Sequence, residues 1–257
     1  MSLPELAAAQ VVGFLLVLAR VGPLFLLAPI FSARALPAQA KLVCACGLSF
    51  ALTPLATEGQ KIPTEGMEAL VVGMKETLVG LAFAFALSAI VAAVQMGAGL
   101  VDTIVGFSYA GVIDPFTSVT GGVIGQLYAL FVAIVLVTTG GDQIIIEGLA
   151  GTYQVLPLGT LPSWNVFGQV AVDAFAQVFV LGLEVVAPLL IALVVVDCAL
   201  ALVARAAPQL NVFAVGLPAK ILVAVTVVIA SLPFVAGHVR TQLEVTVEQT
   251  LVTLSGR

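Results

Sequence analysis

The sequence predicts an all-α integral membrane protein, and three observations lead to this prediction. Of the 257 residues, 61% are hydrophobic and only 9% are charged, whereas soluble domains carry about 25% charged residues. The mean hydropathy is +1.21. The apolar residues lie in long runs separated by short segments rich in Gly, Pro and polar residues. A chain with so few charges cannot cover a water-exposed surface, so lipid or protein partners must surround it.

The first two apolar runs both contain proline. A helix needs about 20 apolar residues to cross a bilayer. Residues 6–31 reach this length, but they include Gly22-Pro23, where we expect the helix to kink or end. Residues 42–56 are short for a full span, and they end near Pro54. A polar loop is expected at residues 57–68.

The later runs differ in length from a single bilayer crossing. Residues 67–101 and 166–204 are too long, so each is expected to be one long helix that projects beyond the lipid or a pair of packed helices. Shorter helices are expected at 123–137, 143–153 and 221–236, a more polar helical tail at 238–257, and breaks at 107–122, 138–142, 156–164 and 208–218. The sequence therefore predicts six to eight helices, and their unequal lengths favour helical hairpins packed against protein.

The residue inventory excludes several classes of function. The nine Lys and Arg residues are scattered, so no basic patch for nucleic acid is expected. The single histidine, His238, excludes catalytic pairs embedded in the spans and the His-Glu-x-x-His zinc motif. Cys44, Cys46 and Cys198 lie in apolar runs and are expected to be small core residues rather than metal ligands. We therefore expect no enzyme activity, no metal and no cofactor.

Charged side chains inside apolar runs need partners, because they are costly at membrane depth. Arg20 has either a functional or inter-subunit role, or it snorkels from a helix that ends at Gly22-Pro23. Asp197 and Arg205 are eight residues apart in one run, which is roughly 12 Å along a helix and too far for a direct pair. Each is expected to find a partner on another segment or subunit, either as a structural ion pair or with a role in transport.

A stripe of small and polar residues follows one face of the long run that begins at residue 67. Its members recur every three or four positions and are Ser88, Ala92, Gln95, Gly99, Asp102 and Gly106. Such a stripe is typical of close helix contact with hydrogen bonds across the interface. The alternative is that the stripe lines a hydrated channel.

Residues 106–122 form an irregular segment with an unusual composition. It contains the glycines Gly106, Gly111, Gly121 and Gly122, the polar or turn residues Ser108, Asp114 and Pro115, and the aromatic residues Phe107, Tyr109 and Phe116. Glycines at both ends permit hinge motion, and the aromatic side chains are large enough to fill a pore. The segment either lies at membrane depth, enclosed by protein or facing a wet cavity, or is a plain loop outside the membrane.

Three stretches of the chain resemble the FliR family, which also covers the equivalent subunit of injectisomes. The first comprises Leu18-Ala19-Arg20-Val21-Gly22, Ala28-Pro29-Ile30-Phe31, Arg34-Ala35-Leu36-Pro37, Lys41 and Leu52-Thr53-Pro54. The second comprises Glu76, Gly80, Gln95, Gly99, Asp102, Gly106-Phe107-Ser108 and Asp114-Pro115. The third is the most specific and comprises Pro188, Asp197, Arg205-Ala206-Ala207-Pro208-Gln209-Leu210-Asn211-Val212-Phe213, Gly216, Pro218 and Lys220.

The resemblance implies a subunit of a protein export gate for unfolded substrates, located in the bacterial inner membrane at the flagellar basal body. In this family, FliP-like and FliQ-like subunits and one copy of this subunit form a closed, cone-shaped assembly of helical hairpins. FlhB-like and FlhA-like proteins are further expected partners, besides membrane lipid. The resemblance also implies a FliP-like part at about residues 1–205 and a FliQ-like part at about 206–257.

The resemblance further assigns roles to particular residues. It places the gate loop at residues 106–122. Intramembrane polar or assembly roles are expected for Arg20, Glu76, Gln95, Asp102, Asp197, Arg205, Gln209, Asn211 and Lys220. Residues 138–142 read Thr-Thr-Gly-Gly-Asp where the family often has Asn-Gly-His, so no role of that histidine carries over. Lys41 stands where arginine is common, so the charge is kept and the bidentate fork is lost.

Other functions remain possible from the sequence alone. One alternative is a small-solute or ion transporter that uses Asp102, Asp197 and Arg205 as an ion site near the midplane. Another is a scaffold that only seeds assembly of a gate. The residues also do not distinguish a flagellum from an injectisome.

Overall fold

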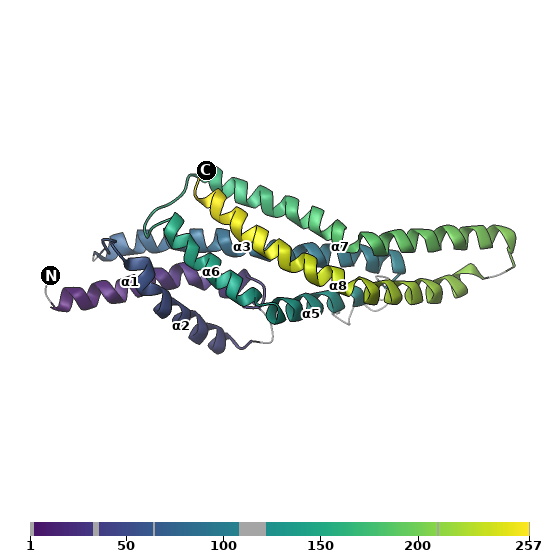
Figure 1. Cartoon of the computed structure of the whole chain (residues 1–257), viewed down its shortest axis with the longest axis horizontal. Coiled ribbons are helices and arrows are strands. Elements are labelled where there is room, and N and C mark those ends of the chain that lie inside the picture. The colour runs from purple at the N-terminus through teal and green to yellow at the C-terminus, as the bar shows by residue number, and fades with distance from the viewer. Residues whose placement is uncertain (1–2, 33–35, 64, 108–121, 210, 257) are drawn as a thin grey trace. The chain divides into compact units, whose positions relative to one another are not determined.

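The computed structural model describes residues 3–32, 36–63, 65–107, 122–209 and 211–256. These residues form seven α-helices and no β-strand, which confirms the all-α prediction and the predicted number of helices. The helices are α1 (Leu3–Leu27), α2 (Ala38–Thr57), α3 (Gly66–Val105), α5 (Val123–Thr138), α6 (Gly141–Val155), α7 (Trp164–Ala206) and α8 (Val212–Leu254) (Figure 1).

Five of these helices are long and apolar enough to cross a membrane, namely α1, α2, α3, α7 and α8. The helices α5 and α6 meet the same criteria together as a bent pair, which raises the number of possible spans to six. Gly140 separates this pair and has a φ of 74°, in the left-handed region that glycine adopts without strain. The described chain therefore has the helices of a multi-pass membrane protein.

The two runs that are too long for one crossing are single helices. Helix α3 has 40 residues and α7 has 43 residues. At a rise of about 1.5 Å per residue, each is roughly twice as long as one bilayer crossing requires. The alternative of one long helix is therefore correct for both runs, and part of each helix must lie outside the lipid or be enclosed by protein.

Two breaks that we expected at prolines are wrong. Helix α1 does not end at Gly22-Pro23, and α8 begins at Val212 and includes Pro218. Helix α2 contains Pro54 and ends at Thr57, close to the expected end at residue 56, but it begins earlier than expected and has 20 residues, the length of a full span. The tail at residues 238–257 is also not separate, because α8 runs through it. A proline inside a helix costs about 3 kcal/mol, but ending a helix in apolar surroundings leaves several backbone groups unpaired at several kcal/mol each.

The chain divides into two compact units. Unit 1 comprises Met1–Ala89, Leu136–Phe175 and Gln242–Arg257, and unit 2 comprises Ile90–Val135 and Ala176–Thr241. Helices α3, α5, α7 and α8 contribute residues to both units. In unit 1, α1 packs against α2, and α2 packs against α6.

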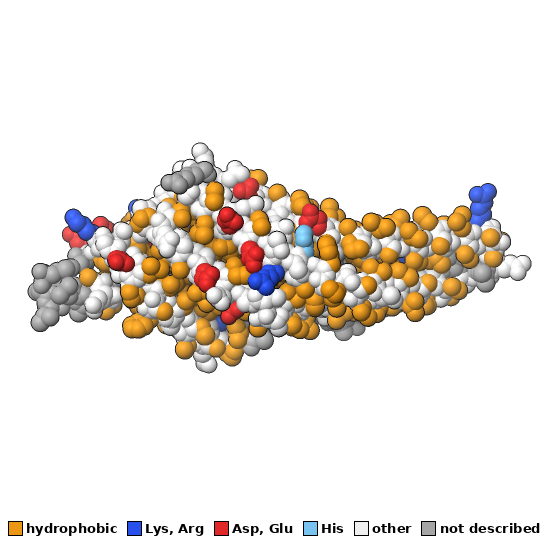
Figure 2. Space-filling view, in the orientation of Figure 1, with side chains coloured by type: hydrophobic (Ala, Val, Ile, Leu, Met, Phe, Trp, Pro, Cys, Tyr) orange, Lys and Arg blue, Asp and Glu red, His pale blue; other side chains and the backbone are white. Residues whose placement is uncertain are grey.

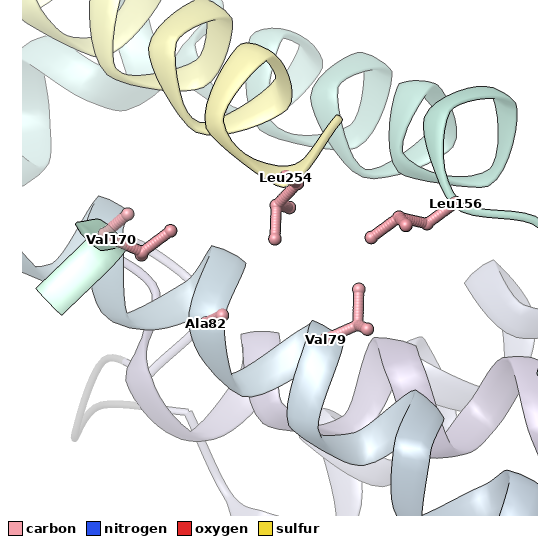
Figure 3. Close-up of a cluster of buried hydrophobic side chains, with 6 residues drawn as sticks. Val79, Ala82, Leu156, Val170 and Leu254 are labelled. Carbon is pink, nitrogen blue, oxygen red and sulfur yellow. The ribbon is translucent and has the colours of Figure 1, made fainter. Parts of the chain in front are cut away.

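A hydrophobic cluster in unit 1 joins segments that are far apart in the sequence. Its buried members are Val79, Ala82 and Ala86 of α3, Val170 of α7, Leu254 of α8, and Leu156 after α6. Figure 3 shows the side chains of Val79, Leu156 and Leu254 pointing toward one another. The cluster therefore fixes one face of α3 against the C-terminal end of α8 and the chain that follows α6.

In unit 2, α3 and α7 approach each other through glycine. A Cβ at Gly97 would lie 2.3 Å from the carbonyl oxygen of Gly182. A Cβ at Gly182 would in turn lie 2.6 Å from the carbonyl oxygen of Ala93. Such backbone contact is possible only with very small residues on both helices. This close contact between helices is made by Gly97, which is not a member of the predicted stripe.

Hydrophobic side chains cover much of the face that Figure 2 shows. On α7 and α8 within unit 2, the exposed large side chains include Phe179, Ile191, Val195, Leu202, Leu222 and Ile229. Cys44 and Cys198 are exposed as well, so the prediction of core cysteines is wrong for these two. In a membrane protein the lipid-facing surface is as apolar as the core, so hydrophobicity alone does not identify the buried face of a helix.

Candidate functional sites

A buried ion pair in unit 1 joins α1 to α3. Arg20 Nε donates to Glu76 Oε2 across 2.6 Å, and both side chains are fully buried. Arg20 Nη1 also donates to the Thr152 hydroxyl at 3.2 Å and to the Leu156 carbonyl at 3.0 Å. Leu156 ends α6. The guanidinium therefore binds a carbonyl at the negative end of this helix, where a cation is favoured.

The aromatic ring of Tyr153 covers the same guanidinium. The ring centroid lies 4.2 Å from Arg20 Cζ, within the range of a cation–π interaction. Arg20 Nη2 and the Tyr153 hydroxyl are buried and have no hydrogen-bond partner among the described residues. The face of the Tyr153 ring therefore attracts the Arg20 guanidinium, which has one nitrogen without a hydrogen bond.

The second carboxylate oxygen of Glu76 fixes the connector between α6 and α7. Glu76 Oε1 accepts the backbone N–H of Gly159 at 2.8 Å, and Lys75 Nζ donates to the Gly159 carbonyl at 3.3 Å. Gly159 has a φ of 82°, a conformation that favours glycine. The ion pair thus connects α1, α3, α6 and this connector in one hydrogen-bonded group.

Gly80 allows α1 to come close to α3 beside the ion pair. A Cβ at Gly80 would lie 2.1 Å from the carbonyl oxygen of Arg20. Gly80 follows Glu76 by four residues, so both lie on the α3 face that meets α1. The snorkelling alternative for Arg20 is wrong, because its side chain is 0% exposed and α1 continues beyond Gly22-Pro23. Its ion-pair partner is in the same chain, and an assembly role for Arg20 and Glu76 remains a prediction.

In unit 2, Asp102 joins the two ends of the 106–122 segment. It lies in the last turn of α3, and its carboxylate oxygens accept the backbone N–H groups of Ile124 at 3.0 Å and Gly125 at 2.9 Å. These are the second and third residues of α5. The first N–H groups of a helix have no partner within the helix, and they attract negative charge. Asp102 therefore caps α5 from a different helix.

Gly122 makes room for this cap. It precedes α5 and has no side chain with which to cap the helix itself. A Cβ at Gly122 would lie 1.9 Å from Cγ and 2.0 Å from Oδ2 of Asp102. We expected glycines at both ends of the segment to act as hinges. At the first end, Gly106 has a φ of 106°, a backbone conformation that favours glycine. At the second end, position 122 requires glycine for a different reason, because the Asp102 side chain occupies the space that a Cβ would need.

Lys220 of α8 joins the same end of α3 to α7. Its Nζ lies 2.5 Å from Asp197 Oδ1 on α7 and donates to the carbonyl of Ile104 at 3.3 Å. Ile104 lies in the last turn of α3, where a cation is favourable. Asp197 thus has a partner on another helix, as expected. We call Asp102, Asp197, Lys220 and the first turn of α5 the loop base.

Other predicted site residues near the α7–α8 connector are more exposed. Arg205 and Gln209 are both exposed, and the described part of the chain provides no ion-pair partner for Arg205. The Asn211 side chain accepts the N–H of Ala214 at 3.2 Å and so caps the N-terminus of α8. A partner for Arg205 in another subunit therefore remains a prediction.

The predicted stripe on α3 is open over its middle part. Ala92, Gln95 and Gly99 are exposed, whereas Asp102 is buried. A Cβ at Gly99 would meet no atom within 4 Å. Within the 106–122 segment, Phe107 is half-buried. The predicted gate residues that lie outside the described part of the chain are Ser108, Tyr109, Gly111, Asp114, Pro115, Phe116 and Gly121.

Sequence reasoning did not find Thr152, Tyr153 and Gly159 as parts of the Arg20 group. Their positions show no pattern that would pair them with a residue more than 130 positions away. Gly97 and Gly182 were missed as well, although small residues in long apolar helices are a general sign of close packing. The described residues also contain no group of three His, Cys, Asp or Glu side chains that could bind a metal ion.

The chain matches one known protein family over a region that contains both the Arg20–Glu76 pair and the loop base. The sequence model of a family described as "Bacterial export proteins, family 1" matches residues 11–245. The chain belongs to this family. The match to the bacterial export proteins includes the Arg20–Glu76 pair and the complete loop base.

Individual members of the family are similar over most of their length. The flagellar biosynthetic protein FliR of Bacillus subtilis is 30% identical over 242 residues, which is 92% of each chain. FliR of Escherichia coli K12 is 29% identical over 219 residues, or 85% of this chain and 84% of the relative. The secretion system apparatus protein SsaT of Salmonella typhimurium is 27% identical over 164 residues, or 63% of each. The predicted FliR family and export function are confirmed, and the small-solute transporter is not supported.

Proposed function

We propose that this chain is one subunit of a flagellar-type protein export gate in the bacterial inner membrane, at the flagellar basal body. The observation that carries the proposal is the family match over residues 11–245. Two relatives named FliR align with 92% and 85% of the chain, whereas SsaT aligns with 63%. This difference in coverage favours a flagellar gate over an injectisome.

The surface of the chain supports a place inside a larger assembly. Large hydrophobic side chains are exposed on most helices, and lipid can cover these. The exposed stripe of Ala92, Gln95 and Gly99 is better suited to another helix, because small residues permit close approach and Gln95 can form a hydrogen bond across the contact. FliP-like and FliQ-like subunits are the proposed partners, with FlhB-like and FlhA-like proteins adjacent. Residues 1–205 are the FliP-like part and 206–257 the FliQ-like part.

Residues 106–122 are the proposed gate loop. A pore wide enough for an unfolded polypeptide would also pass ions, so it must be sealed at rest. An aromatic and apolar segment can seal it by excluding water, and it can yield to an entering chain. The loop base supports this assignment, because Asp102 connects the end of α3 to the start of α5 on either side of the segment.

In this proposal the substrate is an unfolded protein on which the subunit performs no reaction. Its buried charged groups form an ion pair and a helix cap rather than a reaction centre. No cofactor or metal is required. The contribution of the chain is to form part of the pore wall and to keep the pore closed.

The first expected result concerns assembly. The chain expressed alone should aggregate in detergent, because its apolar and small-residue surfaces remain uncovered. Coexpressed with FliP-like and FliQ-like subunits, the tagged chain should be isolated with both of them as one discrete complex. Size-exclusion chromatography with light scattering measures both outcomes. A heat-stable, monodisperse monomer in the absence of partners would contradict the proposal.

A further inference from the structure

An ion pair in unit 2 reaches the surface of two apolar helices. In the sequence, Asp197 is the one charged residue between positions 185 and 204, and Lys220 is the one Lys, Arg, Asp or Glu between positions 206 and 237. Asp197 Oδ1 on α7 lies 2.5 Å from Lys220 Nζ on α8, yet 44% of the Asp197 side chain is exposed, against 21% for Lys220. The carboxylate is therefore the more accessible member of the pair.

The bonds within the chain do not use the full capacity of this carboxylate. An ionised carboxylate can accept about four hydrogen bonds, and Lys220 is the donor that the described residues provide for Asp197. The ammonium group is shared, because it also donates to the Ile104 carbonyl on α3 at 3.3 Å. The exposed part of the Asp197 carboxylate can consequently accept a further bond from outside the chain.

The side chains beside Asp197 are apolar. Val194, Cys198 and Ala201 lie within four positions of it on α7, on the same side of the helix, and all three are exposed. We call these four residues the α7 outer face. The hydrocarbon core of a bilayer offers no hydrogen-bond donor, so a carboxylate facing it is costly. Water would satisfy the carboxylate but is unfavourable beside the apolar side chains. An apolar surface that carries one hydrogen-bond donor fits both parts of the face.

We propose that the α7 outer face binds a helix of a neighbouring gate subunit, and that this helix places a neutral hydroxyl or amide donor against Asp197. The pair of Asp197 and Lys220 has no net charge, so a neutral donor adds a bond without adding an uncompensated charge. Cys198 and Ala201 are small, which allows a second helix to come close. This inference rests on the proposed function as a gate subunit, and it adds the surface and the chemistry of one contact.

Two double variants of the complete gate test this contact. One combines Asp197→Asn with Lys220→Met, and the other combines Asp197→Leu with Lys220→Met. Both lose the ion pair and the bond to Ile104, and Asn and Leu are similar in size. They differ because Asn keeps a side-chain oxygen that accepts a hydrogen bond. The measurement is the amount of tagged chain isolated with the FliP-like and FliQ-like subunits, divided by the total amount of chain in the membrane.

About tenfold more chain is expected in the complex for the Asn variant than for the Leu variant, because the Leu variant leaves a buried donor of the partner unpaired. Lipid on this face would reverse the order, since leucine is favoured in hydrocarbon, and water would give equal amounts. Either of these two results overturns the inference while the parent gate still assembles. A parent chain that does not assemble with these subunits overturns the proposed function itself, and the inference with it.

Ala201→Phe leaves the ion pair intact and decides the case if neither double variant assembles. A phenyl ring at this small position should keep a second helix at a distance and lower the amount of complex about tenfold. Leu202→Phe is the matched control, because Leu202 is 69% exposed at the next position and one large apolar side chain replaces another. Equal amounts of complex for these two variants would mean that no helix packs on the α7 outer face.

Discussion

Replacing Arg20 with alanine is expected to lower the free energy of unfolding of unit 1 by roughly 3–5 kcal/mol. The reason is that Glu76 would remain fully buried without a cation, while Thr152 and the Leu156 carbonyl would lose a donor. A loss of this size is a large fraction of the 5–15 kcal/mol that typically stabilise a folded protein. It should appear as a lower thermal midpoint of the purified gate and a lower yield of assembled complex.

Three further variants show whether the charge pair itself is responsible. Lys61→Ala removes an exposed basic residue in the loop after α2 and should leave the thermal midpoint unchanged. Arg20→Lys should be strongly destabilising, because a lysine cannot bind Glu76, Thr152 and Leu156 with a planar fork. The double variant Arg20→Met with Glu76→Leu should recover part of the loss, because it leaves no buried charge. A midpoint for Arg20→Ala equal to that of the parent would contradict this assignment.

The second large effect is expected at the glycine crossing of α3 and α7 in unit 2. Even alanine at position 97 places a Cβ 2.3 Å from the backbone oxygen of Gly182, so the two helices must move apart. The neighbouring contact of Gly182 with Ala93 would be lost at the same time. Overpacking typically costs about 1–3 kcal/mol even where side chains can adjust, and here the obstacle is backbone.

Gly97→Ala should therefore lower the thermal midpoint of the gate and the yield of assembled complex. Gly168→Ala is the matched control, because a Cβ at that position of α7 would meet no atom within 4 Å. In the control, the higher helix propensity of alanine should leave stability unchanged or raise it by up to about 1 kcal/mol. Equal midpoints for the two variants would show that α3 and α7 do not require glycine at this crossing.

The sequence was sufficient to predict the fold class and the number of helices, because long apolar runs have few structural solutions in a membrane. The sequence was not sufficient to predict the residues at which several helices begin and end. Pro23, Pro54 and Pro218 are strong local signals against a helix, yet each lies inside one. In apolar surroundings the need to pair neighbouring backbone groups outweighs the local preference of a single residue.

The sequence also indicated which charged residues need partners, but not which partners they have. Asp197 was expected to pair outside its own helix, and Lys220 is its partner. Arg20 was recognised as costly, but the choice of Glu76 depends on how α1 crosses α3 at Gly80. The partners of Asp102 are backbone N–H groups, and the residue types in the sequence do not indicate which backbone groups a carboxylate binds. Such contacts are found only when the helices are placed in space.

The central claim is that residues 106–122 seal a protein-conducting pore, and ionic current through the purified complete gate tests it most directly. Parent gates and gates lacking residues 110–117 are reconstituted into planar bilayers at equal amounts of assembled complex. We expect the parent to carry no current above the bare bilayer and the deletion gate to show discrete conductance steps. A deletion gate that is fully assembled and as tight as the parent would contradict the claim and leave the segment a structural connector.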